Sequence, residues 1–291
     1  MSLVVNRATT RLAAFLNRHG LVGVNRFARR LVWRMAGNAV EIEVGGLRIS
    51  GPAESWRVLG QIELGELEPY EVSLFTDAVA QGAVVLDVGA NIGWYTLLAA
   101  RAAGPSGHVY SFEPDPRTLP SLEQNVRANG FSSVSVIPKA ASDASRRQTL
   151  YLSRVAGWSG LSESMDQDSI VGEVTVETVL IDDVLNGTEV DVVKLDIEGH
   201  EPAALRGMAR TLERSRDAQV FLEFNPWALE AADTEPVEFR QILLSGFAEV
   251  NVVDETDSRL RPFLPDLVDT RENLLCRGYR GFPGGSFEAG A

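Results

Sequence analysis

Cysteine is almost absent from this chain. Cys276 is its only cysteine, so no intramolecular disulfide can form, and a lone thiol without zinc-like spacing predicts no zinc site. The sequence also has no uncharged apolar run of about 18 residues, the length that a membrane-spanning helix needs. These absences predict a globular protein of the reducing cytoplasm, with no disulfide and no membrane span.

Acidic residues are missing from the first 37 positions, which carry seven arginines. The remainder has 20 basic and 40 acidic side chains, and this excess of negative charge repels the phosphates of nucleic acids. We therefore expect a small-molecule substrate and no nucleic acid. Helical spacing of arginine and apolar residues over 3–36 predicts two short amphipathic helices. We expect them to pack on the acidic body or to join copies in a homo-oligomer, with a transit peptide or surface anchor as alternatives.

The chain divides at about residue 80. Before that point, alternation around Gly45 and Gly46 predicts a β-hairpin over 40–50, followed by a helix over 68–80. Residues 1–80 are thus expected to form an N-terminal helical extension with a hairpin cap, and residues 81–291 the main domain.

From Ala83 onward, apolar strand-like stretches alternate with helical patterns. Uniformly apolar strands are typical of a parallel sheet covered by helices on both faces, so we predict an α/β, Rossmann-like fold. A Gly/Ser-rich loop over 153–165, which holds Trp158, and an alternating stretch over 173–179 predict an inserted lid. The expected strands are 84–88, 109–113, 134–137, 190–197, 220–224, 247–253 and 273–277, with helices from 92 and over 115–129, 202–214 and 236–244.

The strongest local motif leaves the first core strand as Asp-Val-Gly-Ala-Asn-Ile-Gly over 87–93. Its Gly-x-x-x-Gly spacing is not the Gly-x-Gly-x-x-Gly of a pyrophosphate loop, which disfavours an NAD-dependent oxidoreductase. Glu113, followed by Pro114, ends the next strand, where an acid would accept hydrogen bonds from ribose hydroxyls. Together these residues favour a nucleoside that carries an amino acid.

A second motif runs from Lys194 to Glu201. Side chains two apart on a strand share a face, so Lys194, Asp196 and Glu198 should converge on the crevice beside the glycine loop. Asp196 is a candidate base, orienting group or metal ligand, and an ion pair with Lys194 is plausible, either catalytic or purely structural. His200 is a candidate general base with a pKa suited to neutral pH, or else a helix-start residue facing solvent.

Two further polar residues end the following strand. Glu223 and Asn225, with Asp196, offer three oxygen ligands for a Mg²⁺ ion, although acids at strand ends also bind loop amides. The arrangement is similar to that of metal-dependent catechol-type O-methyltransferases.

These motifs resemble the FkbM family of class I methyltransferases. The resemblance covers 83–209, and weakly extends to Trp227; it includes Asp-x-Gly-Ala-Asn-x-Gly, Phe-Glu-Pro, Asn125, and Lys-x-Asp-x-Glu-Gly-x-Glu. It implies a seven-stranded, mostly parallel sheet and S-adenosylmethionine as methyl donor. The residues that it implies for the donor site are Asp87, Gly89, Ala90, Asn91 and Gly93 at the methionine end, Glu113 and Pro114 at the ribose, and Asp143 at the adenine edge.

We therefore predict an O-methyltransferase that acts on a hydroxyl of a sugar or natural product. Asp196, His200 and Lys194 are the expected catalytic residues. The alternatives are a catalytically silent donor-binding scaffold and an NAD-type oxidoreductase.

Overall fold

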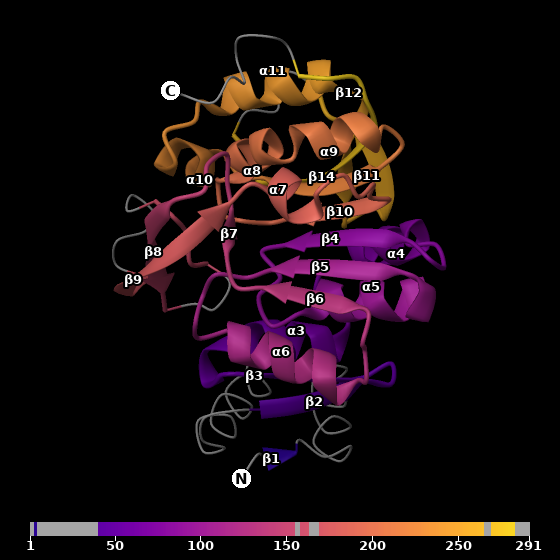
Figure 1. Cartoon of the computed structure of the whole chain (residues 1–291), viewed down its shortest axis with the longest axis vertical. Helices are drawn as coiled ribbons and strands as arrows, with labels where there is room; N and C mark the ends of the chain where they lie inside the picture. Colours follow the sequence, from indigo (N-terminus) through magenta and orange to yellow (C-terminus); the bar gives the residue numbers. More distant parts are fainter. Residues whose placement is uncertain (1–2, 5–39, 155–157, 163–168, 265–268, 283–291) are drawn as a thin grey trace.

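The computed structural model describes residues 3–4, 40–154, 158–162, 169–264 and 269–282, and its centre is an eight-stranded sheet. The strands lie in the order β13-β12-β14-β11-β10-β4-β5-β6 (Figure 1). Their bounds are β4 (Val84–Val88), β5 (His108–Phe112), β6 (Val134–Ile137), β10 (Val192–Leu195), β11 (Gln219–Phe224), β12 (Phe247–Asp254), β13 (Arg259–Pro262) and β14 (Glu272–Tyr279).

The pairings confirm the Rossmann-like prediction. Strands β6, β5, β4, β10 and β11 pair in parallel, whereas β14 runs antiparallel to both β11 and β12. The sheet has one strand more than the seven expected, because β13 pairs with the outer side of β12. This edge strand contains two arginines and ends in Pro262, a composition that sheet edges tolerate. A search for apolar strands does not find it for that reason.

Helices cover both faces of the sheet. Alternation along each strand sends Val85, Val109 and Val192 into one apolar cluster and Leu86, Val193 and Val220 into the other. The first cluster is covered by α3 (Trp56–Leu64), α4 (Pro69–Ala78) and α5 (Trp94–Ala103), whose buried apolar residues belong to it. The remaining helices are α6 (Leu119–Ala128), α7 (Ile181–Leu185), α8 (Glu201–Gly207), α9 (Ala209–Arg214), α10 (Pro226–Ala231) and α11 (Pro236–Gly246).

The helix expected over 202–214 is divided at Met208 into α8 and α9. The last residue of α8, Gly207, packs closely against the turn after β7 (Ala140–Ala141), since a Cβ there would lie 2.0 Å from the carbonyl oxygen of Ser142. The chain after β6 forms a second sheet of β7, β9 (Ile170–Val179) and β8 (Arg147–Ser153), which lies beside the carboxyl ends of the central strands (Figure 1). Strand β9 contains the extra strand expected over 173–179.

The predicted hairpin is present as β2 (Val40–Val44) and β3 (Leu47–Gly51). The amphipathic helices expected over 3–36 lie outside the described residues apart from the two-residue strand β1 (Leu3–Val4), which pairs with β2. The hairpin shares an apolar cluster with α3, α4 and α5, and the domain boundary near residue 80 stays a prediction.

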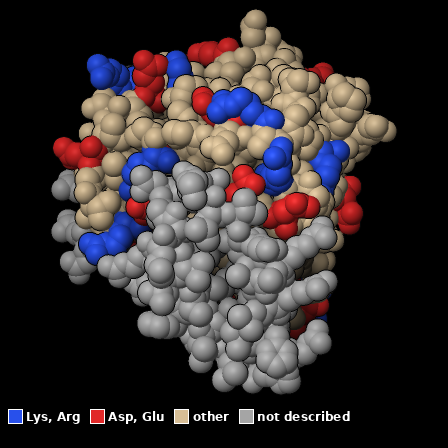
Figure 2. All heavy atoms as spheres, turned by 90° about the horizontal axis from the view of Figure 1, so that it is seen from below, with Lys and Arg blue, Asp and Glu red and all other residues tan. Residues whose placement is uncertain are grey.

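Within the described residues, no helix is both long enough and apolar enough to cross a membrane. On the face seen in Figure 2, the coloured basic and acidic side chains lie interspersed.

Asn125 joins the hairpin to α6. Its Oδ1 accepts from the backbone N–H and the hydroxyl of Ser50, and its Nδ2 donates to the carbonyls of Ser50 and Ile92. The side chain is buried, so these bonds are shielded from water. Asn125 thus links the first glycine loop, the hairpin and α6.

We expect Asn125→Ala to lower the free energy of unfolding by about 2–3 kcal/mol, because buried donors and acceptors lose their partners. Asn129 bonds to Arg48 of the same hairpin at a more exposed place, so Asn129→Ala should cost less than about 1 kcal/mol. Urea denaturation of both variants measures the difference, and equal losses would contradict the role of Asn125.

Candidate functional site

A cavity of about 540 Å³ lies at the carboxyl ends of the central strands. Strand order reverses there, since β4 has β5 and β6 on one side and β10 and β11 on the other. Open parallel sheets bind ligands at this point. Of the residues expected to act, those that line the cavity are Asp87, Gly89, Ala90, Asn91, Glu113, Pro114, Lys194, Asp196 and His200.

The glycines of the first loop are required by packing. Gly89 has φ 86°, and a Cβ there would lie 1.9 Å from the carbonyl oxygen of Asp196. Gly93 has φ 92° and precedes α5, where a Cβ would lie 2.6 Å from a methyl carbon of Leu122. Gly93 therefore shapes the loop from behind, while Gly89 lets Asp196 approach the cavity.

Two buried polar groups beside this loop match the amino-acid end of the methyl donor that the resemblance implies. Asn91 Oδ1 and Trp94 Nε1 are buried and have no hydrogen-bond partner within the described residues, and both residues line the cavity. One atom accepts hydrogen bonds and the other donates them, which matches an ammonium and a carboxylate on one ligand. Asp87 accepts from the Thr96 hydroxyl, and burial raises the pKa of its carboxyl to about 6.

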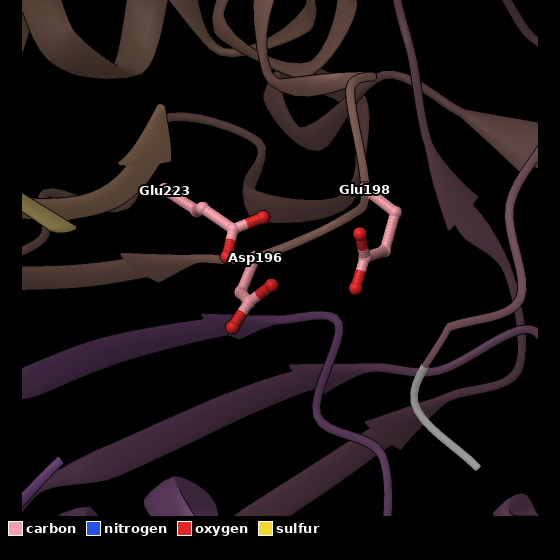
Figure 3. Close-up of side chains that lie close together, drawn as sticks. All are labelled: Asp196, Glu198 and Glu223. Carbon is pink, nitrogen blue, oxygen red and sulfur yellow. The ribbon is translucent and has the colours of Figure 1, made fainter. Parts of the chain in front are cut away.

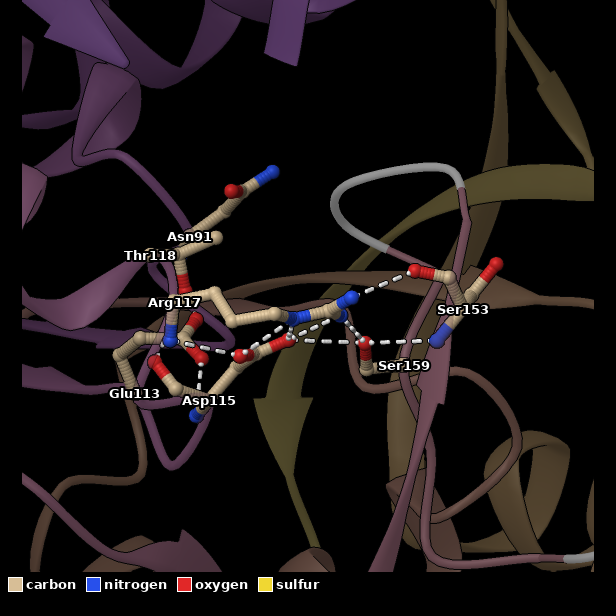
Figure 4. Close-up of polar contacts among 7 residues, drawn as sticks. All are labelled: Asn91, Glu113, Asp115, Arg117, Thr118, Ser153 and Ser159. Carbon is tan, nitrogen blue, oxygen red and sulfur yellow. Dashed lines mark hydrogen bonds and ion pairs between the residues drawn. The ribbon is translucent and has the colours of Figure 1, made fainter. Parts of the chain in front are cut away.

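Glu113 stands at the end of β5, as expected for a ribose-binding acid. Its two carboxylate oxygens accept the backbone N–H groups of Asn91 and Asp115, each at 2.7 Å (Figure 4). Burial raises the pKa of Glu113 to about 7. The side chain is thus held rigidly at the cavity wall and ties the loop after β4 to the loop after β5.

The inserted loop is attached to this wall. The Asp115 carboxylate accepts from Arg117 and from the Ser159 hydroxyl, the latter at 2.9 Å, while Arg117 also donates to the Ser153 carbonyl at 2.9 Å (Figure 4). Ser159 and Trp158 line the cavity. Part of the lid expected over 153–165 lies outside the described residues, so its movement stays a prediction.

Asp143, expected at the adenine edge, does not line this cavity. Its carboxylate forms an ion pair with Arg206 at 2.9 Å in a smaller neighbouring pocket. The reason is the turn after β7, which places residues 139–141 along the main cavity and Asp143 beyond it.

Lys194 is fully buried on β10 and carries its charge between two acids. Its Nζ lies 2.8 Å from Glu71 Oε1 and 3.6 Å from Asp196 Oδ2. The expected pair with Asp196 is present, but the nearer partner is on α4. Burial alone would lower the pKa of Lys194, yet the carboxylates of Glu71, Asp196 and Glu68 together raise it well above its usual value. The lysine is therefore charged, and it orients Asp196 from behind.

Asp196, Glu198 and Glu223 form an acidic cluster in which one oxygen of each lies within 4.8 Å of the others (Figure 3). Two of the three expected ligands, Asp196 and Glu223, are in it. The third, Asn225, lies beside it, with its Nδ2 3.5 Å from Glu223 Oε2, while its Oδ1 accepts the N–H of Ala228 and caps α10. Burial, with the charge of Asp196, raises the pKa of Glu223 to about 7 against its ion pair with Arg271.

His200 lies at the start of α8 and lines both pockets. Burial lowers the pKa of its imidazole to about 4, so the ring is neutral at pH 7. The expectation of a pKa near neutrality is therefore wrong, because desolvation disfavours the charged ring. With so low a pKa the ring is a weak proton acceptor, so His200 is better suited to orienting a ligand by hydrogen bonds than to acting as a general base.

Four further charged residues line or support the cavity and lie outside the motifs of the sequence: Glu68, Glu71, Glu255 and Arg271. Glu255 accepts the N–H groups of Tyr70 and Glu71 at the start of α4. Glu71 did carry a signal, because it precedes Phe75 and Val79 at helical spacing and so places a carboxylate on the buried face. The other three come from distant turns and have no such signal.

Comparison with known proteins agrees with this geometry. The family model described as "Methyltransferase FkbM domain" matches residues 87–252, more than half of the chain. Hexuronic acid methyltransferase AglP of Haloferax volcanii is 28% identical over 207 residues, which cover 65% of this chain and 79% of that protein. Methyltransferase 1 of Beauveria bassiana is 29% identical over 160 residues, covering 48% of this chain and 62% of that protein.

Among solved structures, an S-adenosylmethionine-dependent O-methyltransferase of Thermotoga maritima aligns with a TM-score of 0.42 at 14% identity, covering 84% of this chain and 80% of that one. The family match spans the glycine loop, Glu113 and the stretch from Lys194 to Glu201, which the fold brings together around one cavity. The chain therefore belongs to the FkbM family of class I S-adenosylmethionine-dependent methyltransferases.

Proposed function

We propose that the protein transfers a methyl group from S-adenosylmethionine to a hydroxyl oxygen of a small molecule in the cytoplasm, a sugar or a natural product. The observation that carries this proposal is the carboxylate of Asp196, which reaches the cavity beside the glycine loop. The name of the relative AglP, a hexuronic acid methyltransferase, supports a sugar as acceptor.

The donor supplies a methyl group on a positively charged sulfur, and the chain's residues position the acceptor and take its proton. Asp196 has a partly exposed side chain in the cavity and Lys194 behind it, so it accepts the hydroxyl proton as the oxygen–methyl bond forms and the sulfur–methyl bond breaks. Neutral His200 orients the hydroxyl, and Glu113 holds the ribose end of the cavity. Positioning of the reactants accounts for most of the rate.

The competing function is a silent subunit that binds the donor and scaffolds a complex. Incubating the protein with methyl-labelled donor and a panel of hydroxylated sugars separates the two. Mass spectrometry should find a labelled methyl ether on one acceptor, and a protein that binds the donor yet labels none of a broad panel would favour the scaffold.

Asp196 and Glu113 should separate turnover from donor binding. We expect Asp196→Asn to lower kcat about 100-fold or more while the donor Kd changes less than about tenfold, because the proton acceptor is lost. Glu113→Ala should raise the donor Kd more than about tenfold, since two loops lose their common anchor. Steady-state kinetics and calorimetry measure both, and equally mild effects on both quantities would refute these roles.

We also propose that the acidic cluster of Asp196, Glu198 and Glu223 holds a Mg²⁺ ion during turnover. Its carboxylate oxygens are close enough to share one cation, and Mg²⁺ prefers such ligands. The ion would supply a Lewis acid that polarises the acceptor oxygen.

Chelation tests the metal. Dialysis against EDTA should abolish methyl transfer, added Mg²⁺ should restore it, and Glu223→Gln should raise the Mg²⁺ concentration that is needed. Full activity in the presence of EDTA would refute the metal, and Arg271 would then be the cation that balances this cluster.

A further inference from the structure

Glu71 is a buried acid that the family match does not include, since the match begins at residue 87. Only 1% of the residue is exposed, and its carboxylate lies 2.8 Å from Lys194 Nζ. Its backbone N–H donates to the Glu255 carboxylate at 2.8 Å, which fixes the first turn of α4 against the turn after β12. A helix of the N-terminal segment thereby places a negative charge directly behind the motif of the main domain.

Lys194 is shared among several acidic neighbours. Asp196 lies 3.6 Å from its Nζ, and the ammonium sits 5.0 Å from the centre of the Tyr95 ring. The Tyr95 hydroxyl donates to Glu68 at 2.8 Å, and Glu68 also contributes to the high pKa of the lysine. The carboxylates around Lys194 therefore outnumber its single ammonium, and this group of side chains has a net negative charge.

Asp196 is the carboxylate through which this negative charge faces the cavity. The Asp196 side chain is 30% exposed, whereas those of Lys194 and Glu71 are 2% and 1% exposed. Its backbone lies against Gly89, so the carboxylate stands next to the loop of the donor site. Because these side chains are largely shielded from water, the charge of Glu71 affects the field of Asp196 strongly across the few ångströms that separate each from Lys194.

We propose that Glu71 determines, through Lys194, how much negative charge Asp196 presents to the cavity, and that this charge strengthens binding of the cationic donor relative to binding of the demethylated product. With Glu71 charged, the ammonium is held from behind and only partly neutralises Asp196. Without it, the ammonium pairs with Asp196 alone. Donor and product differ by one methyl group and one positive charge, so a change in charge affects mainly the donor.

Glu71→Gln tests this proposal by binding alone. We expect the Kd of S-adenosylmethionine to rise about three- to fivefold, and that of S-adenosylhomocysteine to change less than about 1.5-fold. Calorimetry in metal-free buffer at pH 8 is suitable, because burial raises the pKa of Glu71 to about 7 and the carboxyl is charged there. Asp183→Asn, at an exposed ion pair with Arg210, is the matched control and should leave both constants unchanged.

The double variant Glu71→Gln/Lys194→Met removes one charge of each sign. It should return the ratio of the two dissociation constants to within about twofold of the unmodified protein, and it guards against a single variant that folds poorly. Circular dichroism establishes folding for each.

Equal weakening of both ligands in folded Glu71→Gln would show a merely structural role and overturn the proposal. This proposal rests on the proposed function, which names S-adenosylmethionine as the donor. The two are refuted by different results, because an unmodified protein that binds neither ligand would refute donor binding itself.

Discussion

The close contact between the ends of β4 and β10 is the constraint on which the site depends. The carbonyl of Asp196 approaches Gly89 so closely that no side chain fits there, and the N–H of Asp196 donates to Val88. Two loops separated by more than one hundred residues are thereby held edge to edge. Because the strand order reverses at this point, the loops diverge above the sheet and leave the cavity between them.

Burial then decides the electrostatics of that cavity. Its walls carry several carboxyl groups, and desolvation raises the pKa of Asp87, Glu113 and Glu223. Ion pairs oppose this effect where a cation is available, as Arg271 does at Glu223 and Lys194 does at Glu71. A cavity of predominantly acidic groups suits a positively charged sulfur compound, and Lys139, Lys194 and Arg271 in its wall are each paired with an acid.

Much of the site could be predicted from the sequence, because its parts are local motifs. The glycine loop, Glu113 and the stretch around Asp196 each lie at the carboxyl end of an apolar strand, and parallel strands bring those ends to one edge. The residues that the sequence did not indicate are those whose role depends on a distant partner. Glu255 accepts the N–H of Glu71 at the start of α4, and Arg271 pairs with Glu223. Asp143, expected at the adenine edge, pairs instead with Arg206 of α8.

The order of strands and helices, the hairpin and the donor loop were determined by the sequence itself, since hydrophobic periodicity and glycine spacing act over a few residues. Only the tertiary structure decided which charges meet. Glu71, Lys194, Glu255 and Arg271 belong to segments far apart in the chain, and strand order brings them together around Asp196. The neutral state of His200 is likewise a product of its burial, and burial exists only once the chain has folded.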